Sequence, residues 1–196
     1  MPTNVLITYT TNAGSTREVA ETIASQLAKN GLVADVRHIG EVQDLRPYGS
    51  VVIGGPMILG WHREVVSFLK KHQQALCQVP VAYFFTAMSL MRTKETHIQG
   101  VPIYIDPGLG KCPQKADRRI FRERYATVEN YLGSVLKKAP QIQPVSAAFF
   151  AGKMDYSRLK LPQILFVKLI LGAQPGDRRN WDAIREWASC LHIAFT

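Results

Sequence analysis

The sequence predicts a doubly wound α/β fold, in which helices cover both faces of a five-stranded parallel sheet. Apolar runs alternate with segments of helical periodicity along most of the chain. Each run is nearly continuous in branched or aromatic residues, which indicates strands buried on both faces. The length of 196 residues suits one domain. We expect the five strands at residues 4–10, 32–39, 50–53, 79–85 and 145–150.

Helical segments follow most of these strands. A first helix is expected from Ser15, because Ser15–Glu18 has the S/T-x-x-E form of a capping box and Gly31 can end the helix. The connection 40–49 is too short for a full helix. Further helices are expected at about residues 62–76, 116–138, 158–171 and 181–193.

One segment, from about Thr93 to Lys115, breaks the alternation. Its three prolines and three glycines favour turns. Because a loop of this length inside a compact domain is usually functional or disordered, we expect an irregular insertion that forms a substrate lid or a partner surface. Its candidate residues are Tyr104, Asp106, Lys111 and Cys112.

Composition and charge exclude several classes of protein. With 46% hydrophobic and 20% charged residues, the chain is neither disordered nor fibrous nor a polytopic membrane protein. The net charge of +9 is concentrated in residues 61–139, which hold thirteen basic and six acidic side chains. Such an excess favours an anionic substrate, an acidic partner or anionic lipid. Nucleic acid is not expected, because no recognition motif accompanies the basic residues.

Cysteine and histidine usage points to a reducing compartment and to no metal. The three cysteines are scattered without CxxC spacing, and the five histidines form no ligand cluster. No signal peptide precedes the first strand, and no apolar stretch is long enough to span a bilayer. We therefore expect a cytoplasmic protein without a metal site.

The main chemical signal lies between the first strand and the first helix. A helix N-terminus offers free amides and the positive end of the helix dipole, and Gly14 allows a ligand to approach the backbone closely. The loop lacks the lysine of a Walker motif and the glycine spacing of a dinucleotide fingerprint. We expect it to bind a phosphate group, the alternative being an ordinary polar turn. Its residues are Thr11, Asn12, Ala13, Gly14, Ser15 and Thr16.

This loop, followed by the YGSVVIGG segment at Tyr48–Gly55, resembles the flavodoxin family, whose members bind FMN. Shorter segments resemble the flavodoxin-like, quinone-dependent protoporphyrinogen dehydrogenases: GGPMILGWH at 54–62, AFFAGKMDY at 148–156 and DRRNW at 177–181. The resemblance covers most of the chain except the insertion. It implies one flavodoxin-like domain over residues 1–196, with the strand order 2-1-3-4-5.

The resemblance also implies a binding site for FMN. The phosphate would lie on Thr11–Thr16, and two further loops would flank the isoalloxazine ring at the carboxyl ends of the strands. Trp61 is the candidate to stack on the ring, or else an aromatic residue packed at a helix start. His62 either donates a proton near the flavin or merely begins the helix. The flanking residues are Pro56, Met57, Ile58, Leu59, Gly60 and Trp61 after the third strand, and Thr86, Ala87, Met88 and Ser89 after the fourth.

The activity implied is that of an FMN-dependent oxidoreductase, which oxidises protoporphyrinogen IX or a similar tetrapyrrole with a quinone as acceptor. The basic charge suits the carboxylates of such a substrate, and the candidates to meet them are Arg118, Arg119, Arg122 and Arg124, although each could be merely a solvated side chain.

Two points stay open in the sequence. The alternative function is a flavodoxin-type electron carrier that serves an acidic redox partner protein and has no small-molecule substrate of its own. An NAD(P)H-dependent quinone reductase lacks any supporting sequence feature. The apolar segment Leu161–Leu171 is either a core helix or a shallow anchor that makes peripheral contact with the inner face of the membrane.

Overall fold

The computed structural model describes residues 4–57, 61–111, 126–158 and 175–196. Its main sheet has the strand order β2-β1-β3-β4-β9-β7-β6. The first five of these strands are all parallel and confirm the predicted fold class and the order 2-1-3-4-5. They are β1 (Asn4–Tyr9), β2 (Val33–His38), β3 (Ser50–Pro56), β4 (Val81–Ala87) and β9 (Ser146–Ala151).

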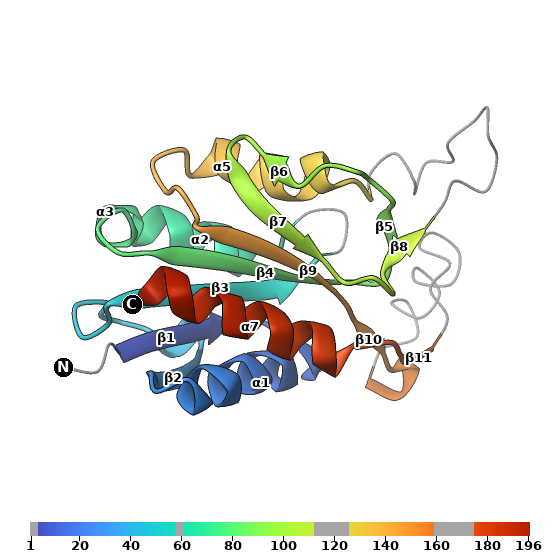
Figure 1. Ribbon diagram of the computed structural model, residues 1–196, viewed down its shortest axis with the longest axis horizontal. Coiled ribbons are helices and arrows are strands. Elements are labelled where there is room, and N and C mark those ends of the chain that lie inside the picture. The colour runs from blue at the N-terminus through green and yellow to red at the C-terminus, as the bar shows by residue number, and fades with distance from the viewer. Residues whose placement is uncertain (1–3, 58–60, 112–125, 159–174) are drawn as a thin grey trace.

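Helices cover both faces of the sheet, as Figure 1 shows. On one face, α1 (Ser15–Lys29) and α7 (Trp181–Phe195) pack together over β1 and β9. On the other face lie α2 (Arg63–Lys71), α3 (Gln73–Leu76), the π-helix η2 (Glu129–Gly133) and α5 (Ser134–Lys138). Successive strand residues alternate between these layers: Val5 and Ile7 belong to the first core and Leu6 to the second.

The start of α1 differs from the prediction. Ser15 is the first helical residue rather than the cap. Gly14 occupies the cap position with a left-handed φ of 87°, and no side chain of the described residues caps the helix. The predicted capping box is therefore wrong, because Glu18 is hydrogen-bonded to Arg179 instead. The predicted end is confirmed: Gly31 has a φ of 90°, and the amide of Leu32 donates to the carbonyl of Leu27 at 3.1 Å.

The insertion is not the irregular loop that its prolines and glycines predict. It contains β6 (His97–Ile98), β7 (Val101–Ile105) and β8 (Gly110–Lys111). Gln99 and Gly100, with φ of 50° and 84°, form the tight turn between β6 and β7. The strand β7 pairs in parallel with β9, and β8 pairs with β5 (Leu90–Met91). The prediction of an irregular loop failed for two reasons. Pro102 is tolerated in β7 because it faces the short edge strand β6, and the pairing of β7 with β9 joins segments far apart in the sequence.

Other boundaries differ in detail. The helix expected at 62–76 is divided at His72 into α2 and α3. Of the helix expected at 116–138, residues 126 and 127 are bends, helical structure starts at Val128, and residues 112–125 lie outside the described part of the chain. The helix expected at 158–171 lies outside it apart from Arg158, which ends η3 (Tyr156–Arg158). Two short strands, β10 (Lys153–Met154) and β11 (Gly176–Asp177), pair beyond β9, and η1 (Ile39–Glu41) follows β2.

Candidate functional site

The loops predicted to bind the cofactor meet at one edge of the sheet, because β1, β3 and β4 are parallel and end there. The amide of Thr10 donates to the carbonyl of Gly54 at 3.0 Å, and the amide of Met57 donates to the carbonyl of Thr86 at 2.9 Å. These bonds hold the three loops together. Pro56, Thr86 and Ala87, which were predicted to lie in loops, are the last residues of β3 and β4, and Met57, Met88 and Ser89 follow these strand ends. Trp61 lies before α2, whereas Ile58, Leu59 and Gly60 lie outside the described residues.

The loop before α1 has an open helix start. The side-chain oxygen of Thr11 accepts a hydrogen bond from the Gly14 amide at 2.8 Å, which closes the loop into a tight turn. Asn12 is exposed, and Ala13, Gly14 and Ser15 are half-buried. The cap residue Gly14 carries no side chain, and within the described part of the chain no side chain caps the helix, so the amides of Ser15 and Thr16 are candidates to bind an anion.

Thr16 holds this helix start against the neighbouring strand. It is 1% exposed, and its hydroxyl lies 3.2 Å from the hydroxyl of Thr86, which is 6% exposed. The Thr16 side chain therefore links α1 to the end of β4. A contact from Thr16 to a phosphate would come from its backbone amide rather than from its hydroxyl.

Thr10 and Glu64 form a polar cluster beside the loop together with His62; the predicted site residues began at Thr11 and left these two out, whereas His62 was already a candidate near the flavin. The hydroxyl of buried Thr10 donates to Oε2 of Glu64 at 2.6 Å, and Nδ1 of His62 lies 3.4 Å from the same hydroxyl oxygen. His62 occupies the cap position of α2, which agrees with the interpretation that it begins the helix. It also lies at the border of the candidate site. The Thr10–Thr11 pair directly after the strand was the only available sequence signal.

Trp61 lies in the core of the protein. Its side chain is 6% exposed, with its ring centroid 4.6 Å from that of Phe85 and 5.2 Å from that of Tyr83. A Cβ on Gly55 would lie 3.0 Å from the indole nitrogen, so this glycine makes room for the ring. The indole would have to leave this position in order to stack on a flavin, and stacking stays a prediction.

Arg179 is a second residue that sequence reasoning missed, because the DRRNW segment entered only as a resemblance. Its side chain is 3% exposed and pairs with both Glu18 and Asp177. These contacts keep the pKa of Arg179 above its usual value; the hydrogen bond to Asp177 is the largest cause, and burial opposes it. The same hydrogen bond lowers the pKa of Asp177.

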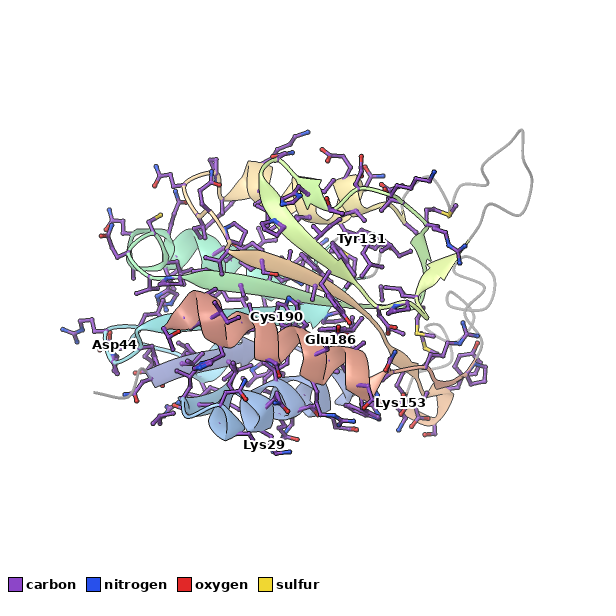
Figure 2. The ribbon with its side chains drawn as sticks, in the orientation of Figure 1. Lys29, Asp44, Tyr131, Lys153, Glu186 and Cys190 are labelled. Carbon is purple, nitrogen blue, oxygen red and sulfur yellow. The ribbon has the colours of Figure 1, made fainter. Side chains whose placement is uncertain are left out.

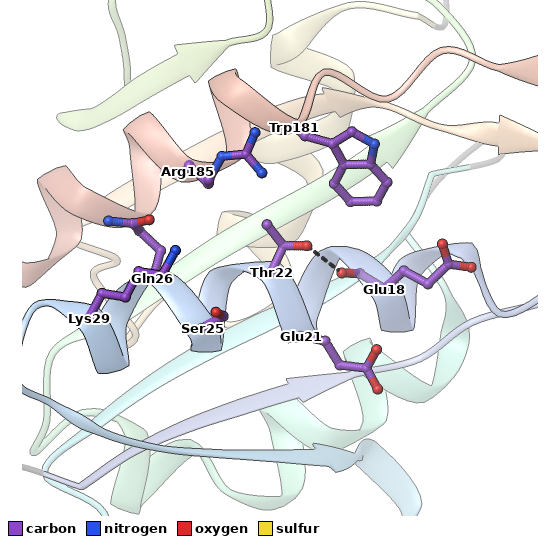
Figure 3. Close-up of a pocket in the computed structure, with 8 residues that line it drawn as sticks. All are labelled: Glu18, Glu21, Thr22, Ser25, Gln26, Lys29, Trp181 and Arg185. Atoms are coloured by element: carbon purple, nitrogen blue, oxygen red, sulfur yellow. Dashed lines mark hydrogen bonds between the residues drawn. The ribbon is translucent and has the colours of Figure 1, made fainter.

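A shallow groove of about 430 Å³ runs between α1 and α7 (Figure 3). None of the predicted cofactor-binding residues lines it. Its lining is polar, and the hydroxyl of Thr22 donates to the carbonyl of Glu18 within it. It is therefore separate from the candidate site. The lining residues are Glu18, Glu21, Thr22, Ser25, Gln26, Lys29, Trp181 and Arg185.

The described part of the chain has neither a metal-binding cluster nor a helix that could span a membrane. Within residues 4–57, 61–111, 126–158 and 175–196, no group of three or more His, Cys, Asp or Glu side chains is arranged to hold a metal ion. No helix in this part of the chain is long and apolar enough to cross a membrane.

The model of the flavodoxin domain family matches residues 6–179, which is most of the chain. The chain belongs to the flavodoxin family. FMN, the cofactor of that family, is therefore the cofactor of this flavodoxin-like protein. The described residues fit such a group at its phosphate end: an uncapped helix start, a left-handed Gly14 and neighbouring hydroxyls form a suitable set of donors.

Relatives of this flavodoxin-like protein include both an enzyme and simple flavodoxins. It is 26% identical to protoporphyrinogen IX dehydrogenase [quinone] of Escherichia coli strain K12, over 96% of its own length and 91% of that enzyme. It resembles the structure of a flavodoxin from the domain Archaea with a TM-score of 0.53, 8% identity and 98% of both chains covered. A rubredoxin oxygen:oxidoreductase from Desulfovibrio gigas gives a TM-score of 0.54 at 11% identity. The match covers 99% of the present chain but only 36% of that longer protein.

Proposed function

We propose that this protein is an FMN-dependent oxidoreductase that oxidises protoporphyrinogen IX, or a similar tetrapyrrole, and uses a quinone as electron acceptor. The observation that carries the proposal is the similarity to the E. coli enzyme, which extends over 96% of this chain and 91% of that one. Sequence similarity over nearly the whole of both chains supports a common reaction better than a similarity in fold does.

The residues of the chain bind and orient the cofactor. The amides at the start of α1 and the hydroxyls of Thr11 and Ser15 would hold the phosphate. The loops after β3 and β4 would flank the ring, and the buried side chains of Met57 and Ala87 would keep water away. When bound, FMN supplies the acceptor for electrons and hydride, while the protein contributes position and electrostatics.

The charge of the protein suits a substrate that carries carboxylates. The predicted cations, Arg118, Arg119, Arg122 and Arg124, lie outside the described residues. Two cations of the described chain lie next to the loop after β4. Lys153, on β10, is labelled in Figure 2 and follows Gly152 in the sequence. The amide of Arg178, directly after β11, donates to the carbonyl of Gly152 at 3.3 Å, and the amide of Gly152 donates to the carbonyl of Ala87 at 2.9 Å. We include both cations among the candidates to attract substrate carboxylates.

The proposed location follows from the proposed acceptor. A lipid-soluble quinone is held in a membrane, so a cytoplasmic protein of this kind would touch the inner face of the membrane while it turns over. The candidate segment for that contact, Leu161–Leu171, lies outside the described residues. Sedimentation with vesicles that contain anionic lipid is expected to carry the protein down; protein that stays in the supernatant removes this part of the proposal.

The test is anaerobic turnover of protoporphyrinogen IX by the FMN-loaded protein, with menadione as acceptor and porphyrin fluorescence as readout. We expect porphyrin to form in proportion to the quinone consumed. A Lys153→Ala/Arg178→Ala variant is expected to raise KM more than it lowers kcat, and Arg46→Ala, at an exposed pair with Asp44, serves as control. If no porphyrin forms while the reduced protein passes electrons to an acidic redox protein, the electron carrier replaces the enzyme.

A further inference from the structure

The side chain of Arg179 lies against the start of α1, although 161 residues separate it from Glu18 in sequence. Its Nη1 atom donates to the backbone carbonyl of Ser15 at 3.2 Å and to Oε2 of Glu18 at 2.8 Å. Both acceptors belong to the first turn of the helix. Because Ser15 belongs both to the predicted phosphate loop Thr11–Thr16 and to the first turn of α1, Arg179 holds the junction between that loop and the helix.

The surroundings of Arg179 fix its guanidinium group in place. Its Nε atom donates to Oδ1 of Asp177 at 2.8 Å, while the second terminal nitrogen, Nη2, pairs with the other oxygen of the same carboxylate. The guanidinium also lies over the ring of Trp181, 4.4 Å from its centroid. A buried arginine is costly unless it is paired, and here two carboxylates and an aromatic face compensate. Lysine cannot reproduce this planar, many-donor arrangement.

Arg179 contacts hydrogen-bond acceptors of the first turn and none of its amide donors. Its partners in the first turn are a carbonyl oxygen and a carboxylate, whereas a phosphate needs the amides. Gly14 at the cap position has no side chain, so the first turn is held by contacts such as those of Arg179 with Ser15 and of Thr16 with Thr86. These contacts of Arg179 with Ser15 and Glu18, hereafter the Arg179 clamp, can therefore orient the amides without occupying the position that a phosphate would take.

The Arg179 clamp is also connected to the loop after β4. Asp177 is part of β11, which pairs with Lys153 on β10. The amide of Arg178 donates to the carbonyl of Gly152 at 3.3 Å, and the amide of Gly152 donates to the carbonyl of Ala87 at 2.9 Å. Hydrogen bonds of the neighbouring residues Arg178 and Arg179 thus connect the start of α1, through Gly152, to the loop predicted to flank the flavin ring.

We propose that Arg179 is a positioning residue for FMN: it holds the first turn of α1 in the geometry that receives the phosphate, and it does not itself touch the cofactor. This inference rests on the proposed phosphate loop at Thr11–Thr16. It assigns a function in cofactor binding to a residue at the other end of the chain, just before α7. A phosphate-specific effect distinguishes this role from a purely structural one.

The test compares the binding of FMN with that of riboflavin, which lacks the phosphate, to wild type, Arg179→Ala, Arg179→Lys and Arg185→Ala. Quenching of flavin fluorescence gives the dissociation constants, and thermal unfolding of the apoprotein defines the temperature at which each variant stays folded. For Arg179→Ala we expect the Kd of FMN to rise at least about tenfold and that of riboflavin to change less than about threefold. Arg185, an exposed partner of Asp182 on α7, is the control and should change neither.

The outcomes separate this inference from the function on which it rests. If wild type binds FMN but Arg179→Ala binds it equally well, or loses FMN and riboflavin to the same extent, the positioning role is wrong. If Arg179→Ala does not fold, the same comparison of FMN and riboflavin dissociation constants is made with Arg179→Lys, which keeps the positive charge but loses the planar set of guanidinium donors. If wild type binds no FMN, or binds FMN and riboflavin equally tightly, the phosphate site itself is wrong.

Discussion

The carboxylate of Asp106 accepts a hydrogen bond from the backbone amide of Ala151 at 3.2 Å and thereby joins the end of β7 to the end of β9. Asp106 is fully buried and also accepts from the Gly108 amide at 2.9 Å. Its third donor is the side-chain amide of Asn180, at 3.4 Å, and Asn180 in turn caps α7. The insertion is therefore fixed to both the sheet and the last helix.

We expect Asp106→Ala to lower the free energy of unfolding by about 2–3 kcal/mol, because it leaves the buried backbone amide of Ala151 without its acceptor. The variant Asp106→Asn keeps one oxygen and is expected to lose less. Urea unfolding at neutral pH measures both values. Equal stability of wild type and Asp106→Ala would show that the insertion is not held by this carboxylate.

The sheet leaves no space for a side chain at Gly54. A Cβ at this position of β3 would collide with the ring of Phe84, which is fully buried on the adjacent strand. We expect Gly54→Ala to destabilise the fold by about 3 kcal/mol, since a packed core does not yield to an added methyl group. The matched control is Gly40→Ala, whose Cβ would lie 3.4 Å from the side chain of His38. Thermal unfolding that ranks the two variants alike contradicts the packing described for β3 and β4.

The buried position of Trp61 leads to a prediction about its role. Replacing it with leucine removes the contacts with Phe85 and Tyr83, so we expect the free energy of unfolding to fall by about 2–4 kcal/mol. The Kd of FMN should change by less than about threefold if the indole stays in the core. A large loss of FMN affinity at little cost in stability would instead show that Trp61 stacks on the flavin.

Acid should weaken the contact between Asp177 and Arg179. The hydrogen bond from Arg179 holds the pKa of Asp177 below its usual 3.8. Because the folded-state pKa is the lower one, this pair stabilises the fold above pH 3.8, and its contribution is lost as the pH falls through the depressed folded-state value. We expect the stability difference between wild type and Asp177→Asn to be constant near neutrality and to shrink on acidification.

Urea unfolding at a series of pH values measures that difference, with Asp182→Asn as control because its side chain is 93% exposed. A difference between wild type and Asp177→Asn that persists unchanged at acid pH would show that the ionised carboxylate does not stabilise the fold.

Sequence patterns predicted those parts of the fold that are determined by residues close together in the sequence. The apolar runs identified the five parallel strands, and Gly31 marked the end of α1 because a left-handed residue is needed there. The capping box at Ser15–Glu18 failed because the true partner of Glu18 is Arg179, far along the chain. The strands of the insertion were missed because β7 depends on pairing with β9, and no local pattern reports that.

In the candidate site too, the features formed by neighbouring residues were predictable and the long-range contacts were not. The loop Thr11–Thr16 combines a strand end, a glycine and a helix start, and all three are visible in the sequence. The residues that hold the loop were not visible: Thr86 contacts Thr16 across 70 positions, and Arg179 contacts Ser15 across 164. Such contacts arise only when the sheet brings its strand ends to one edge.

The most direct test of the phosphate loop is a titration of purified apoprotein with FMN, in wild type, Gly14→Asp and Gly100→Asp. Both glycines have left-handed backbones, with φ of 87° and 84°, but Gly100 lies in the turn before β7, at the other end of the parallel strands. Wild type and Gly100→Asp are expected to shift the flavin absorption band on binding, and Gly14→Asp is expected to lose that binding because its carboxylate repels the phosphate. Equal FMN binding by wild type and both variants would contradict a phosphate site at Thr11–Thr16.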